Sequence, residues 1–261
     1  MKLEYIDIHA HLNLEQFDED REELIKLLIL RSVRVINVGI NYNTSFEVVR
    51  LAEKYPKQMY AIVGAHPTDA KKENFEEKNY IDLIQHPSVV GIGECGLDYF
   101  RMDGDVEKQK KSQEILFRKQ IELAIKYDKP LMIHCRDAYS EVLEILNEYK
   151  KNVGDKLRGN IHFFVGDTDI ARQFLNLNFT ISFTGVLTFA TQYEEVVKFT
   201  PLDMIHAETD SPFVAPLLHR GQRNNPVYIT EIVQKVAQIK GVSEIEASLQ
   251  LLKNSKRVFG I

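Results

Sequence analysis

The sequence contains few cysteines and no long apolar run, and both absences narrow the class of protein. Two cysteines in 261 residues, Cys95 and Cys135, are too few for a disulfide scaffold, and a reducing compartment would keep both as thiols. No stretch approaches the roughly 20 consecutive apolar residues that a membrane helix needs. The polar residues Lys2, Glu4 and Asp7 near the start leave no apolar signal core. We therefore expect a cytoplasmic protein with no membrane segment.

An excess of positive charge and recognisable linkers are also absent. The chain has 33 Lys and Arg against 38 Asp and Glu, so its net charge of −5 gives no global positive field that would attract a polyanion. A nucleic-acid substrate would have to be attracted locally. No low-complexity tract and no long Pro, Gly or Ser linker marks a domain boundary. We expect residues 1–261 to form a single domain, and nothing indicates an obligate protein partner.

The sequence does contain a repeated alternation of strand-like and helix-like segments. Eight short β-rich runs occur, at residues 4–8, 33–38, 60–64, 89–93, 130–133, 160–164, 179–183 and 204–207. Stretches with helical spacing lie between them, such as 107–127 and 142–149. This alternation implies parallel strands joined by crossover helices. An α/β fold of the (β/α)8 TIM-barrel type fits the repeat number, with a doubly wound open sheet as the alternative.

The positions of ionisable side chains distinguish these two folds. Almost every predicted strand has, at or near its end, residues able to bind a metal or a substrate: His9, His11, His66, Glu94, His134, His162, Glu208 and Asp210. A barrel brings the carboxyl ends of all its strands to one mouth, where such enzymes keep their sites. An open sheet would spread the same residues along an edge. The barrel is therefore favoured.

Histidines at alternate positions form the first of these groups, in the segment YIDIHAHLN. In an extended strand, Asp7, His9 and His11 would all point to one face. That face is either a solvated strand surface or one wall of a metal site, and the segment alone does not decide between them.

Six of the strand-end residues can act together as metal ligands: His9, His11, Glu94, His134, His162 and Asp210. One ion with an open position needs three or four, so six indicate two divalent ions, Mg²⁺, Mn²⁺ or Zn²⁺, with Glu94 able to bridge them. Two ions about 3.5 to 4 Å apart can clamp the attacking and leaving oxygens of an in-line displacement at phosphorus. Each residue alone has an ordinary alternative, such as a hydrogen-bonded core histidine or a helix N-cap. Six such alternatives at the ends of successive strands are a less economical explanation than one metal centre.

Six longer segments stand out together: DIHAHLN, VGAHP, GIGECGLDYF, MIHCRDA, ISFTGVLTF and AETDSPFVAPLLHRGQRNNP. In order and spacing they resemble the signatures of the TatD family of metal-dependent deoxyribonucleases, which belongs to the amidohydrolase-like metallohydrolase barrels. The resemblance runs from Ile6 to about Pro226. It implies a TIM barrel with two divalent metals that hydrolyses phosphodiester bonds of DNA, as a 3′ to 5′ exonuclease on single strands or ends.

The resemblance also implies roles for individual residues. His9, His11 and Asp210 would hold one metal, His134 and His162 the other, with Glu94 bridging. Asp210 would also take a proton from the attacking water, and His66 would lie near the scissile phosphate. We interpret Asp7 as a carboxylate that does not bind the metal itself but orients a metal-binding side chain.

Arginines on the loops after the predicted strands are candidates for local attraction of DNA. Arg136, Arg220 and Arg223 are predicted to bind substrate, with Arg101 as a further candidate, because guanidinium groups suit phosphate oxygens. Pairing with nearby carboxylates, such as Asp98, is the alternative for each. Phe100 is a candidate for stacking on a base. The alternative is that its ring packs against other side chains of the protein.

Two positions depart from the family pattern. Val165 stands where a hydroxyl residue is usual, and Asn225 stands where an acidic residue is common. A small ester, amide or lactone, or an aminoacyl ester on RNA, is the alternative substrate on the same scaffold, because fold does not fix substrate. A non-catalytic binding protein is a third possibility, but no proposed ligand is missing.

Overall fold

Eight parallel strands follow one another around a single sheet in the computed structural model, which describes residues 3–70, 75–100, 102 and 104–261. The strands are β1 (Tyr5–Ala10), β2 (Val33–Val38), β3 (Met59–Val63), β4 (Val89–Asp98), β5 (Leu131–Arg136), β6 (Gly159–Ile161), β7 (Phe179–Phe183) and β8 (Ile205–Ala207). A parallel bridge between Ala10 and Ser211 joins the end of β1 to the segment that follows β8. The prediction of a (β/α)8 barrel is confirmed.

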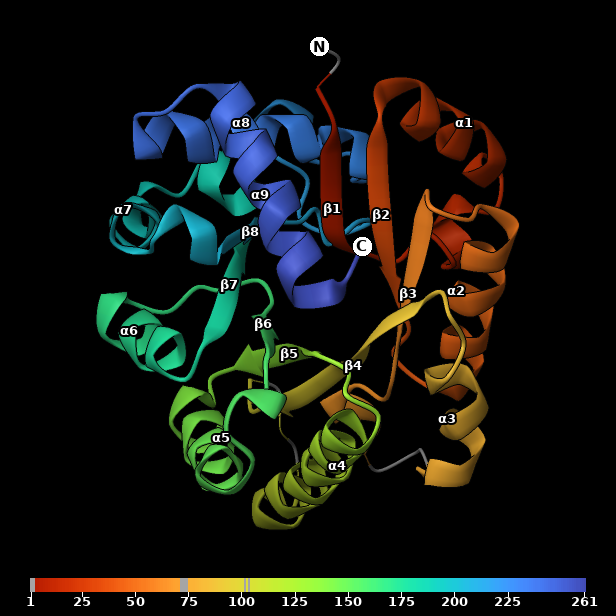
Figure 1. The fold of residues 1–261 in the computed structure, drawn as a ribbon, viewed down its shortest axis with the longest axis vertical. Coiled ribbons are helices and arrows are strands. Elements are labelled where there is room, and N and C mark those ends of the chain that lie inside the picture. Colours follow the sequence, from red (N-terminus) through yellow and green to blue (C-terminus); the bar gives the residue numbers. More distant parts are fainter. Residues whose placement is uncertain (1–2, 71–74, 101, 103) are drawn as a thin grey trace.

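Helices alternate with the strands and lie around the outside of the ring, except the last one (Figure 1). They are α1 (Arg21–Arg31), α2 (Tyr42–Lys54), α3 (Glu77–Ile84), α4 (Val106–Lys126), α5 (Tyr139–Val153), α6 (Thr168–Asn176), α7 (Glu194–Phe199), α8 (Ile229–Lys240) and α9 (Glu244–Phe259). The predicted helical stretches at 107–127 and 142–149 correspond to α4 and α5. None of the helices in the described ranges is long and apolar enough to cross a membrane.

Helix α9 closes the end of the barrel at which the strands begin. An inner apolar cluster joins strand residues to two residues of α9: Ile6, Ile8, Ile36, Val38, Ile62, Val90, Met132, Val258 and Phe259. The side-chain amide of Asn254 donates hydrogen bonds to the carbonyls of Leu202 and Ile205, 2.8 and 2.7 Å long, at the start of β8. The chain end lies near the middle of the ring (Figure 1). The opposite end of the barrel is therefore the open one.

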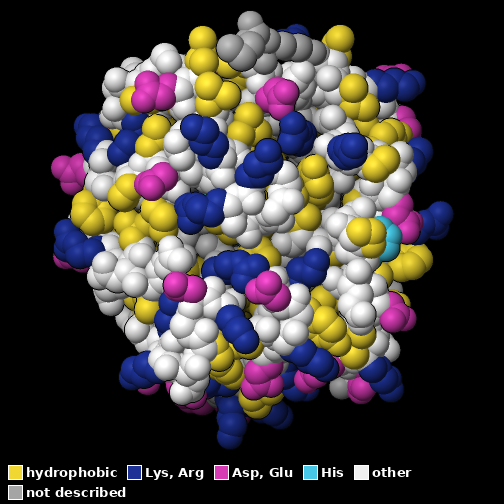
Figure 2. All heavy atoms as spheres, in the orientation of Figure 1, with side chains coloured by type: hydrophobic (Ala, Val, Ile, Leu, Met, Phe, Trp, Pro, Cys, Tyr) yellow, Lys and Arg dark blue, Asp and Glu magenta, His cyan; other side chains and the backbone are white. Residues whose placement is uncertain are grey.

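The face that carries α9 has a mixed surface. Figure 2 shows Lys and Arg side chains dispersed among acidic, polar and hydrophobic ones on this face. A surface that carries both signs of charge among polar and apolar side chains is ordinary for a protein.

Two register shifts change where strand residues point. Asp7 pairs with Val35 and Ala10 with Asn37, so three steps along β1 oppose two along β2. β4 has a similar shift against β5 between Ile92 and Cys95. Each shift is a bulge, and a bulge re-aims the side chains that follow it. Strict alternation is therefore interrupted between Asp7 and the histidines of β1, and the expectation that all three share one face is wrong.

A glycine just after the second bulge lets β4 and β5 approach closely. Gly96 has φ of 138°, and a Cβ placed on it would lie 1.9 Å from the carbonyl oxygen of His134. Only glycine fits such a conformation and such a close approach of two strands. β4 continues to Asp98, so Glu94 lies within the strand. The sequence prediction, which placed Glu94 just after a strand at 89–93, is corrected here. Conversely, β6 ends at Ile161, and His162 follows it directly.

A buried histidine in the barrel floor makes the stability pH-dependent. His206 of β8 is fully buried, its Nε2 has no hydrogen-bond partner in the described chain, and its Nδ1 lies 3.3 Å from the hydroxyl of Ser255. Burial lowers the pKa of His206 to about 3, and the charge of Arg257 contributes in the same direction.

We expect His206→Gln to flatten the acid side of the stability curve. Because folded His206 stays neutral while unfolded His206 protonates near pH 6.5, the wild type is fully stabilised above that pH and loses stability as the pH falls from about 6.5 toward about 3. The loss attributable to this residue is at most about 1.4 kcal/mol per pH unit. Urea unfolding at pH 7, 6, 5 and 4 measures it, and parallel curves for the two proteins would contradict the assignment.

Candidate metal centre

Four side chains meet at the open end of the barrel to form a first donor group. The Nε2 atoms of His9 and His11 lie 3.2 Å apart. Glu94 Oε2 lies 3.3 Å from His9 Nε2 and 3.8 Å from His11 Nε2, and Asp210 Oδ1 lies 3.8 and 3.6 Å from the same two atoms. The bulge in β1 and the start of the loop after β8 bring these residues together.

The second oxygen of Glu94 faces a second donor group. Glu94 Oε1 lies 2.8 Å from His134 Nδ1 and 3.0 Å from His162 Nε2, and these two nitrogens are 3.4 Å apart. His66 Nε2 is 3.5 Å from the same oxygen. The structure thus places all six predicted ligands in one cluster, with Glu94 between two sets.

The donor set fits divalent cations in both chemistry and spacing. Imidazole nitrogens and carboxylate oxygens bind Zn²⁺ at about 2.0 to 2.2 Å, so neighbouring donors around a tetrahedral ion lie about 3.3 to 3.6 Å apart. The donor atoms within each group lie 2.8 to 3.8 Å from one another, a range that includes this spacing. His9, His11 and Asp210 form one group able to hold an ion, and His66, Glu94 and His134 form another.

Hydrogen bonds from the rear of three histidine rings fix which nitrogen faces the centre. His11 Nδ1 donates to the carbonyl of Val38 at 2.8 Å, so Nε2 keeps its lone pair for a metal. His134 Nε2 lies 3.0 Å from Asp98 Oδ2, which leaves Nδ1 for the centre. His162 Nδ1 lies 3.1 Å from Glu208 Oε1. Such rear partners set the tautomer and orientation of ligating histidines.

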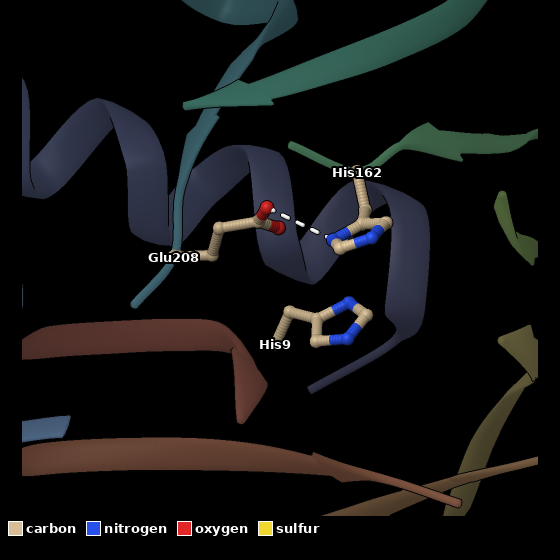
Figure 3. A group of neighbouring side chains, drawn as sticks. All are labelled: His9, His162 and Glu208. Carbon is tan, nitrogen blue, oxygen red and sulfur yellow. Dashed lines mark hydrogen bonds and ion pairs between the residues drawn. The ribbon is translucent and has the colours of Figure 1, made fainter. Parts of the chain in front are cut away.

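Glu208 is a functional residue that sequence reasoning left without a role. Its carboxylate points at the ring of His162, with the ring of His9 beneath (Figure 3). It also accepts hydrogen bonds from the backbone N–H of Phe163 at 2.6 Å and from the hydroxyl of Ser182 at 2.7 Å. The sequence did mark Glu208 as a residue of interest, since it is a carboxylate near the end of a predicted strand. Only the fold shows that it faces a ligand from behind.

Asp98 was missed in a similar way. The sequence suggested it only as a partner for an arginine, whereas its carboxylate is bound to His134. Burial raises the pKa of Asp98, but the hydrogen bond with His134 outweighs this and lowers the pKa overall. Asp98 is therefore ionised and able to hold His134.

Asp7 supports the backbone of the site rather than a histidine ring. Its carboxylate accepts hydrogen bonds from the backbone N–H of Thr209 at 2.9 Å, from the hydroxyl of Thr209, and from the backbone N–H of His9 at 3.2 Å. Burial raises the pKa of Asp7 to about 8, although these bonds oppose the rise. Since Asp210 follows Thr209, Asp7 ties β1 to the segment that carries that ligand. Its role in orienting ligands stays a prediction.

The charge balance of the centre favours cations. Burial raises the pKa of Glu94, but the nearby His162, His66 and His9 outweigh this and hold the pKa well below its usual value. Burial lowers the pKa of His162, and the carboxylates Glu94 and Glu208 outweigh it and raise that pKa well above the usual value. The ionised carboxylates thus favour protonation of His11, His134 and His162, whereas burial lowers the pKa of His9. Metal binding has to displace these protons and should weaken in acid.

A cavity of 750 Å³ opens above the two donor groups. Residues on its walls include the donors His11, His66, Glu94, His134, His162 and Asp210.

Cys95 and Cys135 are both buried as free thiols, and burial raises the pKa of each. Cys135 lines the cavity, but a thiol with a raised pKa is a poor nucleophile, so we interpret both cysteines as packing residues.

The three arginines predicted to bind substrate differ in their surroundings. Arg136 lines the cavity. Arg220 is exposed and stacks on Phe189, with 4.4 Å from its guanidinium carbon to the ring centre. Arg223 donates to both carboxylate oxygens of Asp20, at 2.8 and 2.5 Å.

The pairing of Arg223 with Asp20 occupies its guanidinium group. Binding of substrate by Arg223 would require this ion pair to open, and it stays a prediction. Arg101 lies outside the described residues.

The two departures from the family pattern have local explanations. Val165 lies on the cavity wall and is 39% exposed, so it adds apolar surface where a hydroxyl was expected. The side chain of Asn225 accepts a hydrogen bond from the N–H of Val227 and caps a short 3-10 helix, with no ion pair required.

Comparison with known proteins adds a second line of evidence. The chain matches the family model described as TatD related DNase over residues 6–260. It is 38% identical over 261 residues to the uncharacterized metal-dependent hydrolase YabD of Bacillus subtilis, with 98% of each chain covered. It is 30% identical over 262 residues to the uncharacterized metal-dependent hydrolase YcfH of Escherichia coli K12, covering 98% of this chain and 96% of the relative.

Solved structures agree with these relatives. YjjV, a TatD homologue from Escherichia coli K12, superposes with a TM-score of 0.88 at 25% identity over all of both chains. A TatD-family hydrolase from Entamoeba histolytica superposes with a TM-score of 0.85 at 23% identity over 99% of both chains, which supports the fold alone.

Proposed function

The chain belongs to the TatD family and is a metal-dependent hydrolase, and we propose that it cleaves phosphodiester bonds of DNA, acting as a 3′ to 5′ exonuclease on single strands or ends. The proposal treats residues 1–261 as one barrel domain with two divalent cations, Mg²⁺, Mn²⁺ or Zn²⁺, and no obligate protein partner. The proposal also keeps the cytoplasmic location expected from the sequence.

The observation that carries the proposal is the position of Glu94. One of its oxygens lies 3.3 Å from His9 and the other 2.8 Å from His134, so a single carboxylate faces both donor groups. Two cations held close together by such a bridge suit in-line displacement at phosphorus better than a reaction that needs one cation.

The residues around the centre have separate tasks in this mechanism. When bound, the divalent cations would supply Lewis-acid chemistry, polarising the phosphate and making a water molecule easier to deprotonate. Asp210 accepts the proton of the attacking water. Burial raises the pKa of Asp210, but the hydrogen bond with His11 and the nearby imidazoles outweigh this and lower it, so the carboxylate is ionised at neutral pH.

Three further side chains bind and orient the substrate. His66, with its Nδ1 2.7 Å from the hydroxyl of Thr68, presents Nε2 toward the centre and lies beside the scissile phosphate. Arg136 faces the cavity and binds a phosphate oxygen, and Arg220 attracts the strand as it approaches. A cavity of 750 Å³ is within the range of small-ligand sites, which favours the end of a strand over a duplex interior.

DNA shortening that depends on added metal is the expected result for the purified protein. A single strand labelled at its 5′ end, incubated with Mg²⁺, Mn²⁺ or Zn²⁺, should give a ladder that shortens from the 3′ end, because the metal centre reaches only a strand end. Excess EDTA should abolish the ladder, and dialysis into Mn²⁺ should restore it. A strand blocked by a 3′ phosphorothioate linkage is the matched control.

The same assay distinguishes the alternative substrate class. If DNA stays intact while metal analysis finds the centre loaded, and p-nitrophenyl acetate is hydrolysed, the protein is a hydrolase of small esters on this scaffold instead. Internal cuts in circular single strands would contradict the exonuclease mode while leaving DNA hydrolysis in place.

A further inference from the structure

The cavity above the metal centre has an apolar wall that the metal chemistry does not use. Loops after β6, β7 and β8 supply it: Phe163, Val165, Val186, Tyr193, Phe213 and Val214. Phe213 is 48% exposed and Val165 is 39% exposed, so apolar surface faces the cavity. Exposed apolar surface beside a few convergent polar groups is typical of a ligand contact.

Two aromatic rings of this wall lie directly beside the donor groups. The ring of Phe213 is 6.1 Å from the ring of His11, and the ring of Phe163 is 6.1 Å from the ring of His162. His11 belongs to the first donor group and His162 to the second. The nucleoside attached to a phosphate at the centre is therefore within reach of these rings, and bases stack readily on aromatic side chains.

Arg136 gives the cavity a cationic counterpart to this wall. Its guanidinium carbon lies 3.5 Å from the centre of the Phe100 ring. Arg136 lines the cavity whereas Phe100 does not, so the ring supports a guanidinium group that faces the cavity. Within residues 3–70, 75–100, 102 and 104–261, no other Lys or Arg lines the cavity and no carboxylate is paired with Arg136. The nearby Asp98 is bound to His134.

We propose that the cavity holds the strand end in two subsites. Phe163, Val165 and Phe213 form a base subsite for the terminal nucleobase. Arg136, held by Phe100, forms a phosphate subsite for the phosphate next to the scissile one. The inference rests on the proposed DNA hydrolysis and adds the orientation of the strand, because a flat uncharged base fits the apolar wall and an anion fits the guanidinium.

The base subsite is tested by removing the base. Two single strands are compared, one ending in an ordinary nucleotide and one ending in an abasic residue. We expect wild-type kcat/KM to be about 10-fold to 100-fold lower on the abasic strand, the range that one base stack provides. Phe213→Ala should lose a similar factor on the ordinary strand and little on the abasic one, and Phe213→Tyr should keep the preference. Phe46→Ala is the matched control, since Phe46 is 47% exposed on α2 and does not line the cavity.

The phosphate subsite is tested by removing the charge of one phosphate. Arg136→Gln should lower kcat/KM about 10-fold on an ordinary strand and leave it unchanged on a strand with a neutral methylphosphonate next to the scissile linkage. The slope of log kcat/KM against log salt should become shallower by about 0.7, the value for one phosphate contact on a single strand. Arg172→Gln is the matched control, because Arg172 also stacks on a ring, that of Phe199, at 4.9 Å, and does not line the cavity.

The outcomes separate this inference from the proposed function. Equal cleavage of ordinary and abasic strands by the wild type would overturn the base subsite. Equal losses for Arg136→Gln on charged and neutral strands would overturn the phosphate subsite. DNA that stays intact with every protein and metal would overturn the proposed function itself, and with it both subsites.

Discussion

Asp210→Asn is expected to lower kcat for DNA cleavage by about 10²-fold to 10⁴-fold, the range for loss of a positioned general base. The substitution removes the proposed proton acceptor and one negative charge from the first donor group, where Asp210 Oδ1 lies 3.6 Å from His11 Nε2. It keeps the size of the side chain. It also suits the backbone, because φ of Asp210 is 54° and asparagine adopts positive φ more readily than most residues.

Steady-state cleavage of a labelled strand, with metal content measured on the same preparation, checks this prediction. Asp128→Asn is the matched control, because Asp128 also has positive φ, at 52°, and pairs with Arg158 on the surface. The control should cleave at the wild-type rate. If Asp210→Asn turns over within threefold of the wild type, Asp210 is not the proton acceptor.

Glu94→Gln is expected to remove the metal centre as well as the activity. Glu94 directs one carboxylate oxygen toward each donor group, so its neutralisation withdraws a charged ligand from both. His134 and His162 then keep too few charged partners to hold a divalent ion. We expect metal content to fall from two ions per chain to fewer than one after dialysis, and kcat/KM to fall by at least about 10³-fold, since the cations stabilise the charge of the transition state.

Elemental analysis after dialysis against metal-free buffer measures the first effect, and the labelled-strand assay measures the second. Glu114→Gln serves as the control, because Glu114 forms an exposed pair with Arg118 at 2.9 Å. Two ions per chain retained by Glu94→Gln would contradict the bridging role. One ion retained tightly, with DNA still cleaved at the wild-type rate, would reduce the mechanism to a single cation.

The donor residues could be identified from the sequence because they depend on local information. His9, His11 and His134 each follow an apolar run, and the carboxyl ends of parallel strands must meet in a barrel. Their residue types and order along the chain were enough to predict a metal centre. The prediction that Asp7 points the same way failed, because the bulge in β1 is created by pairing with β2 and has no signature in the period of two.

Supporting contacts between distant segments were beyond the sequence. Glu208 lies 46 positions from His162, and Arg223 lies 203 positions from Asp20. Nothing in the local pattern tells an arginine that is paired from one that faces a cavity, as Arg136 does. The partner of a long polar side chain is chosen by which loops the barrel brings side by side.

The sequence by itself determined the barrel, the chemical nature of the centre and the family. The strand period, the helical spacing and the types of ligand are short-range properties. Each can be recognised within a short stretch of residues, without knowledge of the rest of the chain. The tertiary structure decided how Glu94 divides its two oxygens, which carboxylates hold His134 and His162 from behind, and which arginine remains open to the substrate. Those features depend on strand register and on contacts between loops, which exist only once the eight strands have paired around the barrel.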